Sequence, residues 1–146
     1  MEWDHSVDLL VMGSGGAGQV AAVRARDLGL DVLIVEKGST WGGSTAMSAG
    51  AVWLPNNQAM KDLGLEDSED DGVKYMVHLT GGSVPEERIR TFIREGNRMI
   101  AYLADRTHLR FSSLGTYPDY VPEDPGGRLG GRSLDPEPFD GNELGE

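Results

Sequence analysis

The feature that most constrains the fold is a glycine-rich turn set directly between an apolar run and an amphipathic segment. Residues 7–12 read VDLLVM, a nearly continuous apolar run of the kind expected for a strand buried on both faces of a parallel sheet. GSGGAG follows at residues 13–18, and residues 19–30 have helical periodicity and end beside Gly29, a residue type that favours helix ends. Residues 31–36 (DVLIVE) return to a strand pattern. This order predicts a strand–helix–strand unit over residues 7–36.

The three glycines of the turn have separate physical tasks in a dinucleotide-binding unit. Gly13 permits the tight strand-to-helix turn, Gly15 lets the backbone approach a pyrophosphate, and Gly18 lets the helix pack closely against the strand. The N-terminus of the helix offers unpaired N–H groups and a positive dipole end to the anion. The spacing therefore predicts a phosphate-binding turn.

Glu36 ends the second predicted strand, where a carboxylate can accept a hydrogen bond from a ribose hydroxyl. Its charge also repels a 2′-phosphate, which disfavours NADP. The alternative interpretation is a purely structural turn, in which the glycines serve packing alone. The acid at this distance favours dinucleotide binding.

The segment after Glu36 indicates which dinucleotide is bound. Residues 37–57 are rich in glycine and hydroxyl side chains and are longer than the short connection that an NAD-binding unit normally uses here. Gly42 and Gly43 allow close backbone approach to a second part of a ligand, and small hydroxyls such as Ser44 can donate to phosphate or ring atoms. These properties favour FAD over NAD, with an ordinary surface loop as the alternative.

Residues 8–18 (DLLVMGSGGAG) and 31–57 (DVLIVEKGSTWGGSTAMSAGAVWLPNN) resemble FAD-dependent oxidoreductases of the fumarate reductase/succinate dehydrogenase flavoprotein type. Within them the chain is most similar to the 3-ketosteroid Δ1-dehydrogenases, and residues 117–145 (YPDYVPEDPGGRLGGRSLDPEPFDGNELG) strengthen that narrower match. The resemblance implies an α/β fold, namely the N-terminal portion of a Rossmann-like (GR2-type) FAD-binding domain with a parallel sheet, here incomplete.

The resemblance assigns FAD contacts to residues of the turn, the end of the second strand and the following loop. These are Gly13, Ser14, Gly15, Gly16, Ala17, Gly18, Glu36, Lys37, Gly42, Gly43, Ser44, Thr45, Ser48, Ala49 and Gly50. Two departures stand out: Ala49 replaces a glycine that is usual in the family, and Ser44-Thr45 reverses the commoner order. No histidine lies in this loop, so we expect non-covalent FAD.

A tyrosine in the later segment is the candidate catalytic residue. In the ketosteroid dehydrogenases a tyrosine of the Pro-Asp-Tyr segment borders the substrate and assists proton removal, and by match that residue is Tyr120. An isolated phenol, with a pKa of about 10, is a poor base and needs a partner. The alternative is a tyrosine whose ring packs under a loop. Arg128 and Arg132 either pin this loop or lie in solvent.

The segments between these motifs are expected to be mainly helical. Residues 67–82 predict a helix whose acids, including Asp67, form a solvated start that complements the helix dipole. Residues 83–108 predict a second helix, with Ser83 and Glu86 as a capping box and Pro85 in its first turn. Its apolar positions recur at helical spacing: Ile89, Phe92, Ile93, Ile100 and Leu103. Leu109–Ser112 is a candidate short strand, and irregular backbone is expected from Thr116 onward.

The composition limits which partners and metal sites the chain can have. The net charge of −11 opposes binding to nucleic acid or an anionic membrane surface. The absence of cysteine excludes disulfides and thiolate metal sites, and no other metal site is expected. Residues 38–60 are uncharged but too polar to span a membrane. No signal peptide is recognised, which makes a cytoplasmic location the expectation.

These observations predict one partial FAD-binding domain over residues 1–146. Its parts are the unit at 7–36, a flavin-contacting loop at 37–57, a helical segment at 58–108 and a Pro/Gly-rich loop at 109–146. The expected function is the FAD-binding portion of an oxidoreductase that dehydrogenates a 3-ketosteroid-like substrate, inactive without a complementing polypeptide. The alternatives are a fumarate-reductase-like flavoprotein acting on a small dicarboxylate and a non-catalytic nucleotide-binding module.

Overall fold

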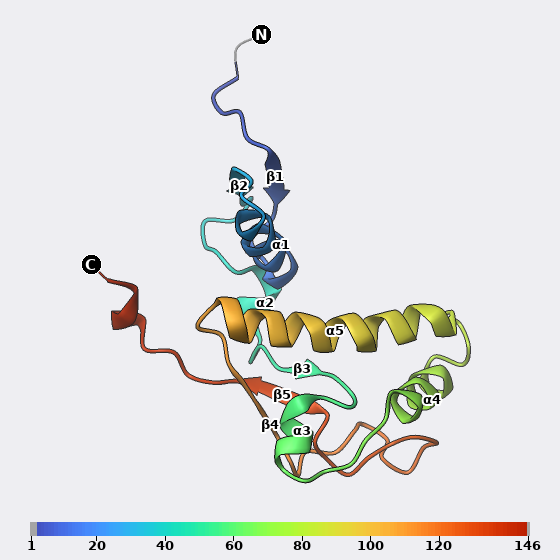
Figure 1. Cartoon of the computed structure of the whole chain (residues 1–146). Coiled ribbons are helices and arrows are strands. Elements are labelled where there is room, and N and C mark those ends of the chain that lie inside the picture. The colour runs from blue at the N-terminus through green and yellow to red at the C-terminus, as the bar shows by residue number, and fades with distance from the viewer. Residues whose placement is uncertain (1–2, 146) are drawn as a thin grey trace. The chain divides into compact units, whose positions relative to one another are not determined.

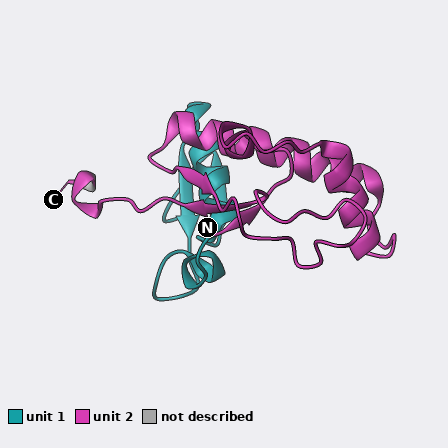
Figure 2. Cartoon of the chain, turned by 90° about the horizontal axis from the view of Figure 1, so that it is seen from below, with its two compact units in different colours: residues 1–50 teal, residues 51–146 magenta. Residues whose placement is uncertain are grey.

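The computed structural model describes residues 3–145, and the chain forms two compact units, Met1–Gly50 and Ala51–Glu146 (Figure 2). Both units contain helices and strands, so the chain is of the α/β type. None of the helices in the described residues is both long and apolar enough to cross a membrane.

The first unit is built on two parallel strands, β1 (Leu9–Met12) and β2 (Val32–Val35), in a register that pairs Leu9 with Val32 and Met12 with Val35 (Figure 1). Helix α1 (Gly16–Asp27) connects them and buries Ala22 and Ala25, while Val11 of β1 is also buried. The expected strand–helix–strand order is present. The helix begins three residues earlier than the periodicity alone indicates.

Gly29 ends helix α1 as expected, because its φ of +83° belongs to the left-handed region that glycine adopts without strain. The N–H of Gly29 donates to Arg26 O at 2.9 Å, and the N–H of Leu30 donates to Ala25 O at 3.1 Å. These bonds satisfy carbonyls at the helix end and direct the chain into β2.

The second unit combines a small antiparallel sheet with helices (Figure 1). The strands β3 (Val52–Trp53), β4 (Phe111–Ser113) and β5 (Ser133–Pro136) are ordered β3-β5-β4. The helices are α3 (Gln58–Asp62), α4 (Glu69–Leu79), α5 (Glu86–Arg106) and the short 3-10 helix η1 (Gly141–Leu144). Helices α4 and α5 pack through Val73, Ile89 and Ile93, all buried.

Several sequence expectations for this unit are corrected. The Ser83–Glu86 capping box is wrong: Pro85 is the N-cap of α5, and the N–H of Ser83 donates to Thr80 O in the turn that follows α4. Phe92 is half exposed rather than buried, because it projects beside the stripe formed by Ile89 and Ile93.

The supposedly irregular stretches also hold structure. Residues 37–57 contain α2 (Gly43–Met47) and β3, and the Pro/Gly-rich stretch contains β5 as well as the expected strand near residue 110. Strand β5 lies between β3 and β4, with Leu134 paired to Val52 on one side and to Ser113 on the other. Its neighbours, which are distant in sequence, make it a strand.

Candidate functional site

The turn after β1 requires glycine at two positions for reasons internal to the fold. Gly13 has a φ of +99°, and its N–H donates to Val35 O at 2.7 Å, which ties the end of β1 to the end of β2. A Cβ on Gly18 would lie 2.2 Å from the carbonyl oxygen of Gly13, so any side chain would force α1 away from the turn. The geometry at both positions agrees with the roles expected from the sequence.

Gly15 is different, because none of the described residues requires a glycine there. Its φ of −64° and ψ of 171° are open to any residue, and a Cβ on it would have Gly42 O at 4.0 Å as its nearest neighbour. The space over Gly15 is therefore free, at the N-terminus of α1. A small residue in such a place allows an external group to approach the backbone.

Ser14 connects this turn to two other segments. Its side chain is fully buried, its N–H and its hydroxyl donate to Glu36 Oε2 at 2.8 and 2.5 Å, and its hydroxyl accepts a hydrogen bond from the N–H of Gly42 at 2.9 Å. One hydroxyl thus fixes the turn, the end of β2 and the loop that follows it.

Glu36 is held as a carboxylate. The N–H of Gly38 donates to its Oε1 at 2.8 Å, and together with the bonds from Ser14 this lowers the pKa of Glu36 from 4.5 to about 2. An open recess of about 480 Å³ lies beside it, lined by Met12, Gly13, Val35, Glu36 and Lys37. The recess leaves room for a ligand next to an ionised acceptor; a ribose contact remains a prediction.

The loop after β2 folds back onto the turn. Gly42, with a φ of +105°, is the N-cap of α2, and Thr45 Oγ1 of that helix accepts a hydrogen bond from the N–H of Gly16 at 3.1 Å. A Cβ on Gly43 would lie 3.4 Å from the Cα of Gly15. The structure therefore brings the predicted residues of the turn and of the loop together in one unit.

The remaining predicted cofactor residues of this loop lie at the surface. Lys37, Ser44 and Ala49 are exposed. The hydroxyl of Ser48 donates to Thr45 O and accepts from the N–H of Gly50, both at 3.0 Å, which shapes the end of the loop. Contacts from these residues to a cofactor remain predictions.

Tyr120 belongs to the second unit, and its side chain is 92% exposed. The alternative in which its ring packs under a loop is therefore wrong for this chain. Arg132 answers the other open question, because it is 1% exposed and pairs with Asp67 and Asp119 at 2.7 and 2.9 Å. It pins the loop that carries Tyr120.

Sequence reasoning missed the partners of Arg132. Asp67 was expected in a solvated helix start, but its side chain is buried and it precedes Ser68, the true N-cap of α4. Burial raises the pKa of Asp67, yet the hydrogen bonds and charge of Arg132, together with backbone hydrogen bonds from Asn56 and Ser68, keep the pKa below its ordinary value. The only hint of these partners in the sequence was that Asp119 directly precedes the candidate tyrosine.

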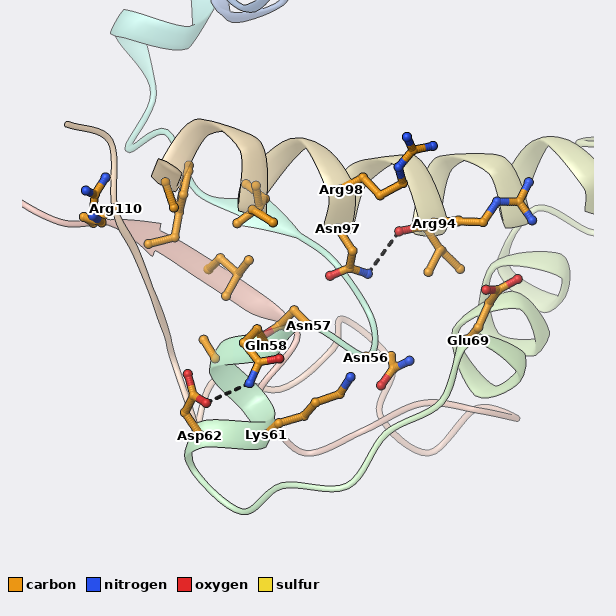
Figure 3. Close-up of a pocket in the computed structure, with 17 residues that line it drawn as sticks. Asn56, Asn57, Gln58, Lys61, Asp62, Glu69, Arg94, Asn97, Arg98 and Arg110 are labelled. Atoms are coloured by element: carbon orange, nitrogen blue, oxygen red, sulfur yellow. Dashed lines mark hydrogen bonds between the residues drawn. The ribbon is translucent and has the colours of Figure 1, made fainter. Parts of the chain in front are cut away.

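A second hollow lies in the Ala51–Glu146 unit, along α5 and facing α3, with a volume of about 590 Å³ (Figure 3). Apolar side chains that include Ile100, Phe111 and Leu134 line it, and Lys61 and Arg94 stand among its polar residues. No residue predicted to contact cofactor or substrate contributes to it.

The comparison with known families agrees with the prediction of dinucleotide binding that was made from the glycine-rich turn. The FAD binding domain family matches residues 8–146, so the chain belongs to this family of flavoprotein domains. FAD is accordingly its cofactor.

The curated relatives include steroid dehydrogenases. The 3-oxosteroid 1-dehydrogenase of Mycolicibacterium smegmatis is 44% identical over 138 residues, which cover 94% of this chain and 24% of the relative. The crystal structure of the 3-ketosteroid delta1-dehydrogenase from Sterolibacterium denitrificans in complex with 1,4-androstadiene-3,17-dione matches with a TM-score of 0.88 and 40% identity, over 96% of this chain and 25% of that one.

A fumarate-type flavoenzyme is also similar over a shorter stretch. The NADH:fumarate oxidoreductase of Klebsiella pneumoniae is 37% identical over 103 residues, 69% of this chain and 11% of the relative. The chain spans about a quarter of the length of the steroid dehydrogenases that it matches.

Proposed function

We propose that this chain supplies the FAD-binding portion of a flavin-dependent oxidoreductase that dehydrogenates a 3-ketosteroid-like substrate. The observation that carries the proposal is the free space over Gly15, which the fold does not need, in a chain 44% identical to a 3-oxosteroid 1-dehydrogenase. The proposal includes a Rossmann-like, GR2-type domain, with a cytoplasmic location as the matching expectation.

The residues of the first unit fit the cofactor part by part. The backbone around Gly15 and the N-terminus of α1 would receive the pyrophosphate, because N–H groups and the helix dipole favour an anion there. The ionised Glu36, beside its recess, would accept from the adenosine ribose. Residues 42–50 would lie toward the ribityl chain and the flavin ring. No histidine lies in this loop, which supports non-covalent attachment.

Tyr120 would border the substrate and assist removal of a proton beside its ketone. Its exposure leaves the phenol available to a ligand. The bound flavin would supply the acceptor for the electrons that leave the substrate. Proton removal beside a ketone needs a competent base and a donor that polarises the carbonyl, and Tyr120 would only assist in it.

A complementing polypeptide is part of this proposal, whether it continues this chain or comes from another. Leu10, Met12 and Val35 at the two-stranded sheet are 52%, 84% and 42% exposed, an apolar surface that water disfavours. The sheet also has unpaired strand edges. With this surface uncovered, we expect weak FAD binding and no turnover.

Two other functions compete with this one. A fumarate-reductase-like activity is supported by the 37% identity to the fumarate oxidoreductase and would make Tyr120 dispensable. A non-catalytic nucleotide-binding module would bind ADP about as well as FAD, because nothing beyond the adenine half would be recognised.

Ligand binding and complementation test the proposal together. Thermal shifts of the 146-residue chain with FAD, NAD and ADP should show the largest stabilisation with FAD. Adding the downstream polypeptide of a steroid dehydrogenase should first tighten flavin binding and then give oxidation of 4-androstene-3,17-dione with an artificial electron acceptor. Oxidation of this steroid by the isolated chain would refute the need for a complement, and equal shifts with ADP and FAD would favour the binding module.

A further inference from the structure

Tyr120 combines an exposed side chain with an anchored backbone. Its ring is 92% exposed, whereas Asp119 before it is 6% exposed. The N–H of Asp119 donates to Arg128 O at 2.9 Å, and the N–H of Val121 after it donates to Tyr75 Oη at 3.2 Å. The residues on both sides are fixed, so the backbone of Tyr120 has little freedom. The Tyr120 segment thus combines an anchored backbone with a side chain that is open to a ligand.

The carboxylate of Asp119 is bound on both oxygens. Its Oδ1 accepts from Trp53 Nε1 at 2.7 Å, and its Oδ2 accepts from Arg132 Nη1 at 2.9 Å and from the N–H of Arg128 at 3.0 Å. The side chains of Asp119 and Arg132 are 2% and 1% exposed. The residue directly before Tyr120 is therefore held by a buried side chain as well as by its backbone.

Arg132 also ties Asp119 to the segment before α4. Its Nε and Nη2 donate to the two oxygens of Asp67 at 2.9 and 2.7 Å, and its Nη1 also donates to Gly126 O at 2.8 Å. Such a two-bond fork fixes orientation as well as distance. The loop from 119 to 132 is thereby closed against a rigid helix start, and the closure depends on directional bonds.

We propose that Arg132, acting through Asp119, and Tyr75, acting through Val121, are positioning residues that hold the backbone of Tyr120 in place before any ligand arrives. This inference rests on the proposed role of Tyr120 at the substrate. Its use is preorganisation: a substrate does not have to order the loop that carries Tyr120 when it binds.

Tyr75→Phe is the sharpest test, because it removes the hydroxyl that receives the Val121 N–H and keeps the ring that lies 5.8 Å from that of Trp53. By NMR, we expect amide exchange at Val121 to rise by about tenfold or more, because exchange follows the free energy of opening the hydrogen bond. The Tyr120 ring resonances should show more motion. Arg132→Lys, which cannot form the fork to Asp67, should have the same effect.

Tyr117 is the internal reference, because it is exposed, lies three residues earlier and is not flanked by these anchors. Thr80→Val is the matched control: it removes a hydroxyl that donates to Met76 O at 2.8 Å but no bond to the Tyr120 segment. It should leave Tyr120 unchanged. Equal changes at Tyr117 and Tyr120 in Tyr75→Phe, or none at Tyr120, would overturn the inference.

A measurement on the wild type guards against variants that fail to fold. Tyr120 should be more ordered than Tyr117 in the unmodified chain, and equal mobility would also overturn the inference. Failure of the proposed function would give a different experimental result. If Tyr120→Phe left steroid oxidation by the complemented enzyme unchanged while the NMR results held, the positioning would stand and the substrate role of Tyr120 would be lost.

Discussion

Replacing Gly15 by valine should separate cofactor binding from folding. The φ of −64° is allowed for valine, and the nearest atom to the new Cβ is Gly42 O at 4.0 Å, which is an ordinary contact. Gly15 is the N-cap of α1, where valine is less favourable than glycine, so we expect the cofactor-free chain to lose about 1 kcal/mol of unfolding free energy and to stay folded. The new side chain fills the space that a pyrophosphate would need, so FAD binding should be strongly weakened.

The size of this loss follows from the bonds that a pyrophosphate would make. A hydrogen bond between a backbone N–H and a charged group contributes about 1.5–3 kcal/mol. Displacing one or two of them gives a loss of about 3 kcal/mol, or about a hundredfold in Kd. Flavin fluorescence titration measures this change, and circular dichroism checks that the helices persist.

Two further glycine variants serve as controls for this experiment. In Gly18→Val the Cβ would meet Gly13 O at 2.2 Å, so this variant should lose stability and FAD binding together. Gly141→Val has no atom of the described residues within 4 Å of its new Cβ and should leave both unchanged. Wild-type affinity for FAD in a folded Gly15→Val protein would refute the assignment of this turn to the phosphates.

Three other predictions follow from named contacts. Glu36→Arg should weaken FAD binding by about 1.5–3 kcal/mol, since it removes a charged acceptor; Glu66→Arg, the same charge change at an exposed site, is the control in the same fluorescence titration. Because the folded-state pKa of Glu36 is lowered to about 2 from 4.5, its carboxylate stabilises the fold above about pH 4.5, and this contribution is lost as pH falls toward 2. Glu36→Gln should flatten that part of the pH profile of thermal unfolding, and an unchanged profile would contradict the bonds from Gly38 and Ser14. Arg132→Met should destabilise the Ala51–Glu146 unit by about 3–5 kcal/mol, because it leaves Asp67 and Asp119 buried without their cation; urea unfolding measures this loss, and a neutral outcome would show that the two carboxylates find other partners.

The sequence by itself determined the features whose cause is local. The apolar runs before Gly13 and Glu36 predicted β1 and β2, the glycine spacing predicted the turn, and the helical period predicted α4 and α5. Gly13 and Gly18 could be explained in advance because φ and close packing of a helix on its own strand depend on neighbours in sequence. The resemblance to flavoenzymes rested on the same short segments.

Tertiary structure alone decided which distant groups meet. Strand β5 is only four residues long, lies in a Pro/Gly-rich stretch and ends in a proline, so it is a strand because β3 and β4 bond to its two sides. Asp67 looked like a solvated acid at a helix start until Arg132, far along the chain, was placed against it. The hydroxyl of Ser14 likewise acquires its role from Glu36 and Gly42. A buried charge or hydroxyl is stable only with its partners in place, and those partners are chosen by how the chain folds back on itself.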